Sequence, residues 1–497
     1  MKVIILCLIV LFSLVNLSLG DCNVYISSVS NNTNNCTKET PCESFQNALK
    51  VCEDMNQTST MTFNFDIGNY TIENSIHQMS IFNQTIMLNG SQNGTTTLSF
   101  TDPDSKVLVI YEPVGATSGS TNLNLQYLTL TNLDNSFLKS RTNMTNVDVT
   151  LLDCNFANVN AINPLFDMVS YNTQISLSIL NSTFQDMTSS TNQTIIYSGS
   201  NVNLSILNSN FINSHTTSSL ITSNQDYISL TNSVFNNNQI ADQPMISIVN
   251  AVSVSISQGS RFSGNSLFPN GTIVPLLQIS GKTFISGLFF ENNTNVNGLL
   301  FSGNSTTVTS NSLIVSGNIL KDYFLQLTSQ SKLNIMNAQF TKNSVSSTGS
   351  FFSAIDNSTL ELFDSSFVEN TGYINNVIYS DATFGDNTFS DNTNFEFFYC
   401  DHSNVFYTGD YPLSALIAQS DIVCGEICII NYKPGCIQPG GTQSSSSDST
   451  PSPKNSKSDA GKIALIIILI TVGVAITAGV VYYFVKRHHK HHYTRLH

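Results

Sequence analysis

The feature that most constrains this chain is a short pattern that returns along residues 123–392, each time around one large apolar residue. Successive anchors lie roughly 21 to 30 residues apart, a period typical of solenoid proteins. The chain is therefore expected to fold as a stack of similar coils. The anchors are Leu133, Phe156, Phe184, Phe211, Phe235, Phe262, Phe289, Ile319, Phe340, Phe367 and Phe389.

Each repeat contains an alternating stretch that ends in two adjacent apolar residues. Val202, Leu204 and Ile206 alternate with polar residues, as in a half-buried strand. The adjacent pair predicts a bulge or bend at a corner, because regular alternation places neighbours on opposite faces. Such pairs stand before the anchor at Leu151/Leu152, Ile179/Leu180, Phe284/Ile285, Ile314/Val315, Ile335/Met336 and Leu362/Phe363.

Two further positions recur relative to the anchor. Two residues before it stands a small residue, as a tight inside corner requires, and three residues after it stands Asn, which favours turns. The small positions are Cys154, Ser182, Ser209, Ser233, Gly287, Gly317, Ala338 and Ser365. The turn positions are Asn238, Asn265, Asn292, Asn343, Asn370 and Asn392, with Asp322 in the Ile319 repeat.

Three short strands and three corners per repeat predict an all-β chain, a right-handed parallel β-helix. The alternative is a leucine-rich-repeat horseshoe, whose LxxLxLxxN spacing overlays the same positions. That fold needs a bulky aliphatic residue where this chain has Ser, Gly or Cys, and it has one strand per repeat. The β-helix is therefore favoured.

The two ends of the chain carry targeting patterns. A basic start, an apolar run and small residues predict a secretory signal peptide over residues 1–20. Residues 463–485 contain no charge and are long enough for a transmembrane helix. The basic residues at the start of the 486–497 tail place that tail in the cytosol. A type I, single-pass protein of the plasma membrane is expected, with the endolysosomal membrane as the alternative.

Between these ends the sequence predicts four segments. They are an N-terminal cap with a short helix (21–60), the β-helix repeats (61–399), a Cys-containing C-terminal cap (400–439) and a Ser/Pro-rich stalk (440–462). Residues 21–442 hold 11 Lys and Arg against 31 Asp and Glu, a net charge of −20. A surface of that charge is a poor partner for nucleic acid.

Eight cysteines of the secreted part lie outside the repeats. In a secretory compartment they predict disulfide-bonded caps, with a zinc site as the alternative. Cys154 occupies a small inward position and is expected to be a buried free thiol. The disulfide candidates are Cys22, Cys36, Cys42, Cys52, Cys400, Cys424, Cys428 and Cys436.

The N-terminal stretch DCNVYISSVSNNTNNCTKETPCESFQNALKVC resembles the opening of pectin-lyase-like β-helix domains. The resemblance implies a first strand at residues 24–27, a Cys-containing loop and an amphipathic helix. Phe45, Ala48 and Leu49 would then cover the open end of the core. The Phe-x-x-Asn anchors also resemble those of β-helical surface adhesins. These likenesses span most of residues 22–400 and imply a fold more than a function.

Pectin-lyase-like enzymes cut acidic polysaccharides with clustered Asp, or with Ca²⁺ and an Arg or Lys base. The repeats show no Asp-Asp pair and no Gly-His-Gly step, and their only His is His215. No catalytic residue, metal site or cofactor is therefore expected. The basic residues Arg261, Lys282, Lys321, Lys332 and Lys342 look scattered. The acidic residues Asp153, Asp186, Asp364 and Glu369 are expected to be solvated turn residues, and the last two are expected to lack counterparts in adjoining repeats.

Two kinds of modification or sorting pattern are present. Tyr493 and Leu496 fit a tyrosine-based sorting signal for a cytosolic adaptor. Asn-x-Ser/Thr acceptors predict N-glycosylation. The glycosylation candidates are Asn56, Asn69, Asn83, Asn143, Asn181, Asn203, Asn270, Asn304 and Asn357.

Taken together, the patterns predict a membrane-anchored glycoprotein whose β-helical ectodomain serves recognition or adhesion without catalysis. Its ligand would be an extracellular glycan or a surface protein. The alternative is a membrane-tethered polysaccharide hydrolase or lyase. Two or more carboxylates on one outward face of neighbouring coils would favour that alternative.

Overall fold

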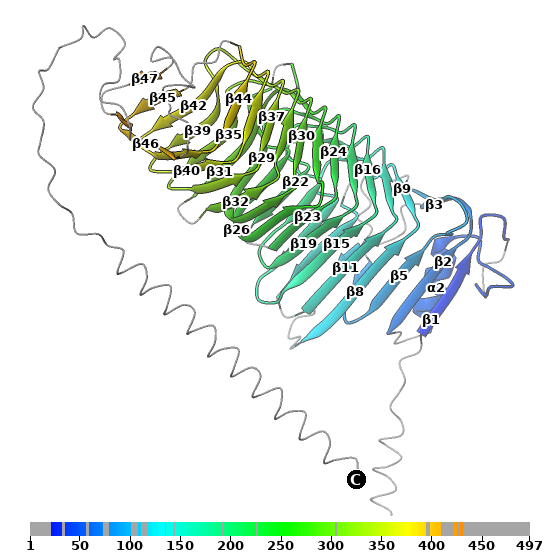
Figure 1. Ribbon diagram of the computed structural model, residues 1–497. Helices are drawn as coiled ribbons and strands as arrows, with labels where there is room; N and C mark the ends of the chain where they lie inside the picture. The colour runs from blue at the N-terminus through cyan, green and yellow to red at the C-terminus, as the bar shows by residue number, and fades with distance from the viewer. Residues whose placement is uncertain are drawn as a thin grey trace, which may run out of the picture. The chain divides into compact units, whose positions relative to one another are not determined.

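Parallel strands stacked rung upon rung make up the described part of the chain (Figure 1). The computed structural model describes residues 21–430, apart from 32–34, 56–58, 73–78, 101–107, 111–117, 135, 144, 190–192, 225–226, 270, 304–305, 394–397, 409–421 and 425–427. These residues belong to one compact unit, Met1–Gly441. A second unit, Thr442–His497, lies outside them.

Over residues 145–355 each coil passes through four ladders of hydrogen-bonded strands, and the coils before and after them lack a named strand of ladder 3. Every pairing between named strands is parallel. Along the chain, a strand of ladder 1 is followed by one of ladder 2, one of ladder 3 and one of ladder 4. An example is β19 (Val202–Leu207), β20 (Asn210–Ile212), β21 (His215–Thr216) and β22 (Ile221–Asn224). Ladder 2 forms a 13-stranded sheet. Strands β26, β29 and β31 run through corners and thereby join ladders 1, 3 and 4 into a 35-stranded sheet. The parallel solenoid predicted from the repeats is confirmed, and the horseshoe is excluded.

Ladder 1 consists of β1 (Asp21–Ile26), β2 (Thr60–Phe65), β5 (Thr85–Asn89), β8 (Gly119–Gln126), β11 (Thr145–Leu152), β15 (Ile175–Leu180), β19 (Val202–Leu207), β23 (Tyr227–Thr231), β26 (Ile246–Ser257), β29 (Pro275–Ser286), β32 (Thr307–Asn311), β36 (Lys332–Met336), β40 (Thr359–Phe363), β43 (Asp381–Gly385), β46 (Ser403–Thr408) and β48 (Cys428–Ile430). Ladder 2 consists of β3 (Gly68–Ile72), β6 (Thr96–Phe100), β9 (Thr129–Thr131), β12 (Asn155–Ala157), β16 (Thr183–Gln185), β20 (Asn210–Ile212), β24 (Val234–Asn236), β27 (Arg261–Ser263), β30 (Phe289–Glu291), β33 (Ile314–Ser316), β37 (Gln339–Thr341), β41 (Ser366–Val368) and β44 (Thr388–Ser390).

Ladder 3 consists of β13 (Asn160–Ala161), β17 (Thr188–Ser189), β21 (His215–Thr216), β25 (Gln239–Ile240), β28 (Ser266–Leu267), the start of β31 (Thr294–Ser302), β34 (Ile319–Leu320) and β38 (Ser344–Val345). Ladder 4 consists of β4 (Met79–Ile81), β7 (Leu108–Ile110), β10 (Leu138–Thr142), β14 (Phe166–Ser170), β18 (Ile196–Ser198), β22 (Ile221–Asn224), the first parts of β26 and β29, the end of β31, β35 (Tyr323–Thr328), β39 (Ser350–Ile355), β42 (Tyr373–Ile378), β45 (Phe398–Asp401) and β47 (Ile422–Cys424).

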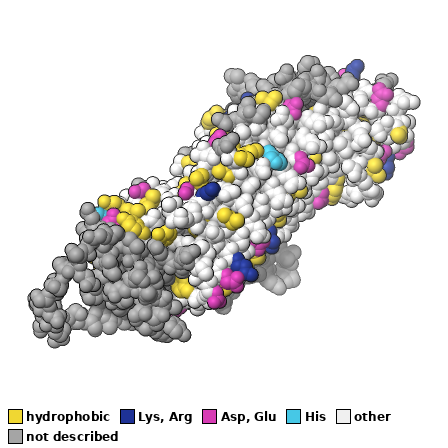
Figure 2. All heavy atoms as spheres, turned by 90° about the horizontal axis from the view of Figure 1, so that it is seen from above, with side chains coloured by type: hydrophobic (Ala, Val, Ile, Leu, Met, Phe, Trp, Pro, Cys, Tyr) yellow, Lys and Arg dark blue, Asp and Glu magenta, His cyan; other side chains and the backbone are white. Residues whose placement is uncertain are grey.

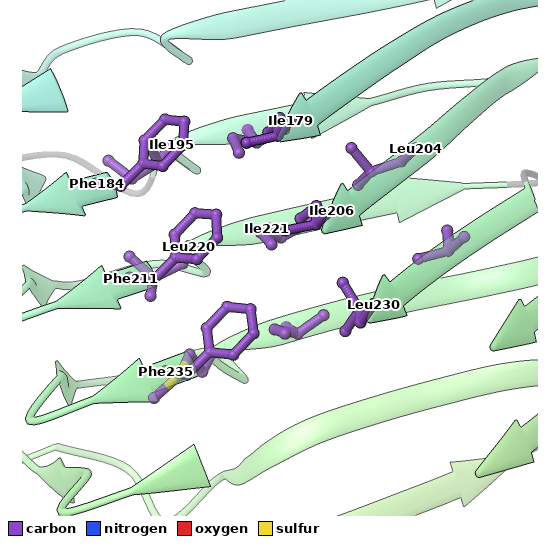
Figure 3. Packing of buried hydrophobic residues seen from close by; sticks show 14 of the residues in the cluster. Ile179, Phe184, Ile195, Leu204, Ile206, Phe211, Leu220, Ile221, Leu230 and Phe235 are labelled. Carbon is purple, nitrogen blue, oxygen red and sulfur yellow. The ribbon is translucent and has the colours of Figure 1, made fainter. Parts of the chain in front are cut away.

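The anchor residues form a stack inside ladder 2. The rings of Phe184 and Phe211 lie nearly parallel with centroids 4.7 Å apart, and Phe235 follows at 4.8 Å (Figure 3). Burying such a side chain contributes on the order of 1.5–3 kcal/mol. The spacing of the rings matches the distance between neighbouring strands, so one Phe fits each rung.

Three predicted anchors were misplaced. Strand pairing aligns Leu130 with Phe156, Phe290 with Phe262, and Val315 with Phe340. These three residues, and not Leu133, Phe289 and Ile319, occupy the stack. Each of the three lies within four residues of the apolar residue that was predicted instead, so the linear pattern fits either choice, but the register does not.

Of the bulge or bend predicted at the apolar pair, β19 shows a bend directly after the pair and no bulge within it, because the strand keeps its alternation to the last residue. In β19, Ile206 is buried whereas the adjacent Leu207 is partly exposed. The change of phase occurs at the next residue, Asn208, whose φ is 51°. One left-handed residue turns the chain, so that Phe211 faces the interior again.

Left-handed residues stand on both sides of nearly every strand in ladder 2. Before the strands they are Tyr127, Asp153, Asn181, Asn208, Asn232, Gly259, Gly287, Ser312, Asn337, Asp364 and Asp386. After the strands they are Asn132, Asn158, Asp186, Asn213, Asn237, Gly264, Asn292, Gly317, Lys342, Glu369 and Asp391. Asn, Asp and Gly adopt this conformation most readily, which explains why the repeats are rich in Asn.

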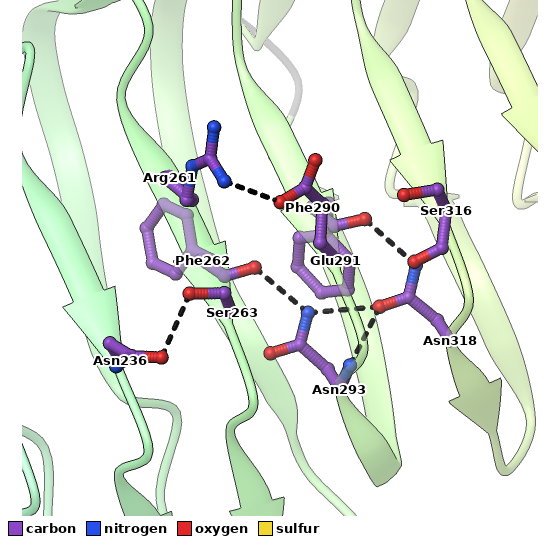
Figure 4. A network of polar contacts seen from close by, with 9 residues as sticks. All are labelled: Asn236, Arg261, Phe262, Ser263, Phe290, Glu291, Asn293, Ser316 and Asn318. Carbon is purple, nitrogen blue, oxygen red and sulfur yellow. Dashed lines mark hydrogen bonds and ion pairs between the residues drawn. The ribbon is translucent and has the colours of Figure 1, made fainter.

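A buried ladder of asparagine side chains follows the second corner. The Nδ2 atom of Asn293 donates to the carbonyl oxygen of Phe262 at 3.0 Å and to Oδ1 of Asn318 at 2.9 Å (Figure 4). Asn293 and Asn318 thus take the places predicted for Asn292 and Asp322. The ladder members are Asn238, Asn265, Asn293, Asn318, Asn343, Asn370 and Asn392.

The small position before the anchor carries a second ladder over part of the solenoid. The backbone N–H of Ser182 donates to Oγ of Ser209 at 3.1 Å, and that of Ser209 donates to Oγ of Ser233 at 3.4 Å. Two predicted members are corner residues instead, because Gly287 and Gly317 have φ values of 69° and 64°.

Disulfide bonds tie down both ends of the described solenoid. The amphipathic helix α2 (Phe45–Asp54) buries Phe45 and Ala48 against the first rungs, as the resemblance implied. Cys22–Cys52 joins this helix to β1, and Cys36–Cys42 closes the preceding loop. Cys400–Cys428 joins β45 to β48, and strand pairing continues through β48, beyond the expected end of the repeats at residue 399.

Candidate functional site

A groove of about 410 Å³ lies over three neighbouring strands of ladder 4, namely β39, β42 and β45. Its lining is formed by Ser347, Thr348, Gly349, Ser350, Tyr373, Asn375, Asn376, Ile378 and Tyr399. These residues come from three successive rungs, so the groove exists only once the coils have stacked.

One wall of the groove is a tight turn that precedes β39. The backbone N–H of Gly349 donates to the carbonyl of Ser346 at 3.0 Å. A Cβ atom at Gly349 would lie 2.5 Å from the carbonyl oxygen of Asp322 on the preceding rung. Only glycine lets the turn approach that closely, and the turn presents the hydroxyl groups of Ser347 and Thr348 to the groove.

Strand β42 contributes two asparagines to the lining. Asn376 pairs in register with Tyr399 of β45, and its Oδ1 atom is buried and accepts no hydrogen bond within the described part of the chain. Asn375 is 1% exposed and takes the register position of Phe352, yet neither of its amide atoms has a partner there. A buried polar group without a hydrogen bond lowers the free energy of unfolding by about 1–3 kcal/mol, so these two residues destabilise the fold.

Among the described residues, the lining holds no charged side chain. Two tyrosine rings and Ile378 supply apolar surface, while hydroxyl and amide groups supply hydrogen bonds. This mixture suits an uncharged ligand with both apolar faces and many hydroxyl groups. Across the wider surface, the view in Figure 2 shows few charged side chains among mostly uncharged ones, and some acidic and basic side chains lie next to each other.

The acidic residues singled out from the sequence are exposed corner residues. Asp153, Asp186, Asp364 and Glu369 all have φ between 50° and 55°. The expectation that the last two lack counterparts is wrong. Ser366 pairs with Thr388 in ladder 2, so Asp364 and Asp386 stand at one corner on adjacent rungs, and Glu369 and Asp391 stand at the next.

The basic residues are less scattered over the surface than the sequence suggested. Lys282 and Lys332 both pair in register with Thr307, so they occupy one outward column of ladder 1. Arg261 lies 4.9 Å from the ring centroid of Phe289 and 2.8 Å from a carboxylate oxygen of Glu291. Lys342 and Glu369 form an exposed ion pair at 3.6 Å, which is worth little in water.

The structure contains no group of three or more His, Cys, Asp or Glu that could hold a metal ion among the residues it describes. Cys154 is a buried free thiol there, as predicted. Desolvation raises the pKa of this thiol to about 12, which makes it unreactive near neutral pH.

Several predicted sites fall outside the described residues. They include Asn56, Asn270, Asn304, Cys436, Tyr493, Leu496 and the expected membrane span at 463–485, and also the side chain of Cys424. Of the other acceptor asparagines, Asn69, Asn83, Asn143, Asn181 and Asn357 are exposed and Asn203 is partly exposed. Where the chain is described, none of its helices has the length and apolar character needed to cross a membrane.

Sequence reasoning did not find the groove. The sequence patterns did not single out Tyr373, Asn376 and Ile378. One signal was available: Asn375 interrupts a column of apolar residues, Leu325 and Phe352 in the two preceding rungs. That interruption becomes visible only when the rungs are aligned.

No protein-family model and no curated protein sequence matches this chain. Similar solved structures include a rhamnogalacturonan lyase, with 10% identity, a TM-score of 0.31, and 65% of this chain and 82% of that chain covered. The catalytic domain of a GH87 α-1,3-glucanase has 9% identity, a TM-score of 0.31, and coverage of 83% and 69%. A GH136 lacto-N-biosidase from Eubacterium ramulus has 10% identity, a TM-score of 0.23, and coverage of 77% and 64%. The solved structures similar to this parallel solenoid thus include polysaccharide lyases and glycoside hydrolases.

Proposed function

We propose that this protein binds carbohydrate in the groove over β39, β42 and β45. The observation that carries the proposal is the lining, in which Tyr373 and Tyr399 stand beside amide and hydroxyl groups without any charge. Sugar rings combine an apolar C–H face with a rim of hydroxyl groups. Tyrosine rings stack against such faces, and Asn, Ser and Thr side chains bond the hydroxyls.

The size of the groove fits a short oligosaccharide. Its volume of about 410 Å³ lies within the usual range for small-molecule sites, roughly 300–1,000 Å³. The part of the lining that the structure describes contributes no carboxylate, and hydrolysis of a glycosidic bond needs a pair of them. Binding without cleavage is therefore the activity that the groove itself supports, in agreement with a role in glycan recognition.

A second candidate function, polysaccharide cleavage, is favoured by a different observation. Asp364 and Asp386 stand one rung apart at the same exposed corner, and Glu369 and Asp391 do so at the next corner. Adjacent rungs are about 4.8 Å apart. That spacing is near the roughly 5–5.5 Å that separates the two carboxyl groups in retaining glycosidases. The register thus supplies the paired carboxylates on neighbouring coils that the enzyme alternative requires.

One experiment separates these two functions. The purified chain is incubated with neutral and acidic polysaccharides, with and without Ca²⁺, and both retention and newly formed chain ends are recorded. Retention without new ends, lost in Tyr399→Ala but kept in Tyr227→Ala, supports binding. Tyr227 is a suitable control because it is 51% exposed on ladder 1, away from the groove lining. New chain ends that disappear in Asp364→Asn or Asp386→Asn would establish cleavage instead.

We also propose that residues 463–485 anchor the solenoid in the plasma membrane, with a glycan or a surface protein as its extracellular partner. The support is the uncharged span followed by basic residues and preceded by a secretory signal. The full chain should stay in the membrane fraction after an alkaline wash, and a chain ending at residue 442 should be secreted. Secretion of the full chain would refute the anchor.

A further inference from the structure

Resting on the proposed carbohydrate binding, we infer that the groove selects an uncharged sugar that carries an acetamido group, an N-acetylhexosamine. The carrying feature is the placement of the Asn376 amide beside the Ile378 side chain in the same groove. An acetamido substituent consists of an amide joined to a methyl group. The two side chains offer one partner for each part.

Asn376 and Ile378 are two residues apart on β42, so they face the same side of the strand at about 7 Å from each other. Both are partly exposed, and both line the groove. The amide of a bound acetamido group can pair with Asn376 while its methyl group packs on Ile378. A sugar that has a hydroxyl group in this place would bring a polar group against the isoleucine and leave it poorly solvated.

The amide of Asn376 can offer either a hydrogen-bond donor or a hydrogen-bond acceptor to a ligand. Its Oδ1 atom is buried and accepts no hydrogen bond from the described residues, so no donor there fixes how the amide faces. Turning the amide by half a turn exchanges the donor and the acceptor. An acetamido group, which has one N–H and one C=O, can be met in either orientation.

Tyr399 places the ring of the sugar. It is the register partner of Asn376 on the next rung, and side chains opposite each other on adjacent strands lie within about 5.5 Å. A pyranose stacked on Tyr399 therefore holds its substituent over β42. The uncharged lining also disfavours the ammonium of a deacetylated amino sugar and the carboxylate of a uronic acid, because neither would find a counter-charge.

The test uses the full-length chain and three trisaccharides that share one linkage: N-acetylchitotriose, cellotriose and the deacetylated chitotriose. Calorimetric titration should give at least tenfold tighter binding of N-acetylchitotriose than of the other two. Ile378→Ser should remove most of this preference. The control is Ile355→Ser, the register partner of Ile378 on β39, which is also partly exposed but lies outside the lining.

The outcomes separate the inference from the proposed function. Equal affinity for N-acetylchitotriose and cellotriose, with both lost in Tyr399→Ala, would overturn the acetamido preference and leave carbohydrate binding intact. Tighter binding of the deacetylated trimer would overturn it as well, because charge would then dominate. Failure of all three sugars to bind, by a chain that unfolds with the same cooperativity as its control variant, would overturn both.

Discussion

Asn293 donates one Nδ2 hydrogen to Oδ1 of Asn318, 2.9 Å away on the next rung, and its own backbone N–H donates to that same oxygen at 2.9 Å. The pattern repeats along the C-terminal half of the solenoid. The Oδ1 atom of Asn293 accepts from the backbone N–H and from Nδ2 of Asn265 on the preceding rung. Its Nδ2 atom donates to the carbonyl of Phe262 and to Oδ1 of Asn318. In a dry interior such a fully bonded amide stabilises the stack, whereas an unbonded one would destabilise it.

Asn293→Ala should lower the free energy of unfolding by about 3 kcal/mol. The change removes the acceptor for two donors of Asn265 and the donor to Phe262, and each orphaned buried group costs about 1–3 kcal/mol. Urea unfolding followed by circular dichroism measures this. The control is Thr309→Ala on the exposed side of β32, expected within about 0.5 kcal/mol of the parent. A ladder variant as stable as that control would contradict the proposed role.

The register at β30 predicts opposite fates for two adjacent phenylalanines. Phe290 is 0% exposed and belongs to the stack, whereas Phe289 is partly exposed under Arg261. Phe290→Ala should cost about 3–5 kcal/mol because it leaves a cavity. Phe289→Ala should cost about 1 kcal/mol, since it removes a partly solvated ring and one cation–π contact. Equal losses in thermal unfolding, or a larger loss at Phe289, would show that the register is wrong.

A third pair of variants compares two buried asparagines. Asn375 has no hydrogen-bond partner among the described residues, so Asn375→Leu should raise the free energy of unfolding by about 1–3 kcal/mol. Asn343 is bonded on both sides, so Asn343→Leu should lower it by a similar amount. Chemical denaturation of the two variants in parallel measures both signs. A destabilised Asn375→Leu would mean that the amide has a structural partner after all.

Stability should fall at high pH. Desolvation raises the pKa of the Cys154 thiol from 9.0 to about 12 and that of the Tyr323 phenol from 10.0 to about 12. Between about pH 9 and 12 the unfolded chain loses these protons while the folded chain keeps them. The contribution is thus complete below pH 9 and declines above it, by up to about 1.4 kcal/mol per pH unit for each group.

Cys154→Ala should flatten this decline between pH 9 and 10, where Tyr323 does not yet contribute. Equilibrium unfolding of parent and variant at half-unit steps of pH measures the difference. Parallel curves for the two proteins would refute a buried thiol. As an independent check, the native thiol should resist alkylation at pH 8 and react once the chain is unfolded.

The solenoid could be predicted from the sequence because each rung needs a buried apolar residue and turn residues at similar positions. Phe156 and Phe184 were placed correctly since no other large apolar residue stands within two positions of them. Phe289 and Phe290 stand side by side, and the choice between them depends on which residue before the strand is the left-handed corner residue, here Gly287. That choice is settled by strand pairing, which a single linear pattern does not contain.

The groove was beyond the sequence for a related reason. Tyr373, Asn376 and Tyr399 come from two neighbouring rungs, and the coils between anchors differ in length, so no fixed spacing connects them. The pairing of Asp364 with Asp386 was missed in the same way. Local features such as the short helix with Phe45 and Ala48 and the cysteine-rich first segment could be found, because neighbours in sequence decide them.

The side-chain ladders connect each rung only with the rungs on either side of it. A coil therefore makes no ladder contact with distant parts of the molecule. The number of coils can change during evolution by one whole coil at a time. An in-frame duplication or loss of one coil would join two ends that already have the same cross-section. Lineages carrying such a gene could lengthen or shorten the rod and keep the groove, as long as its three rungs remain together.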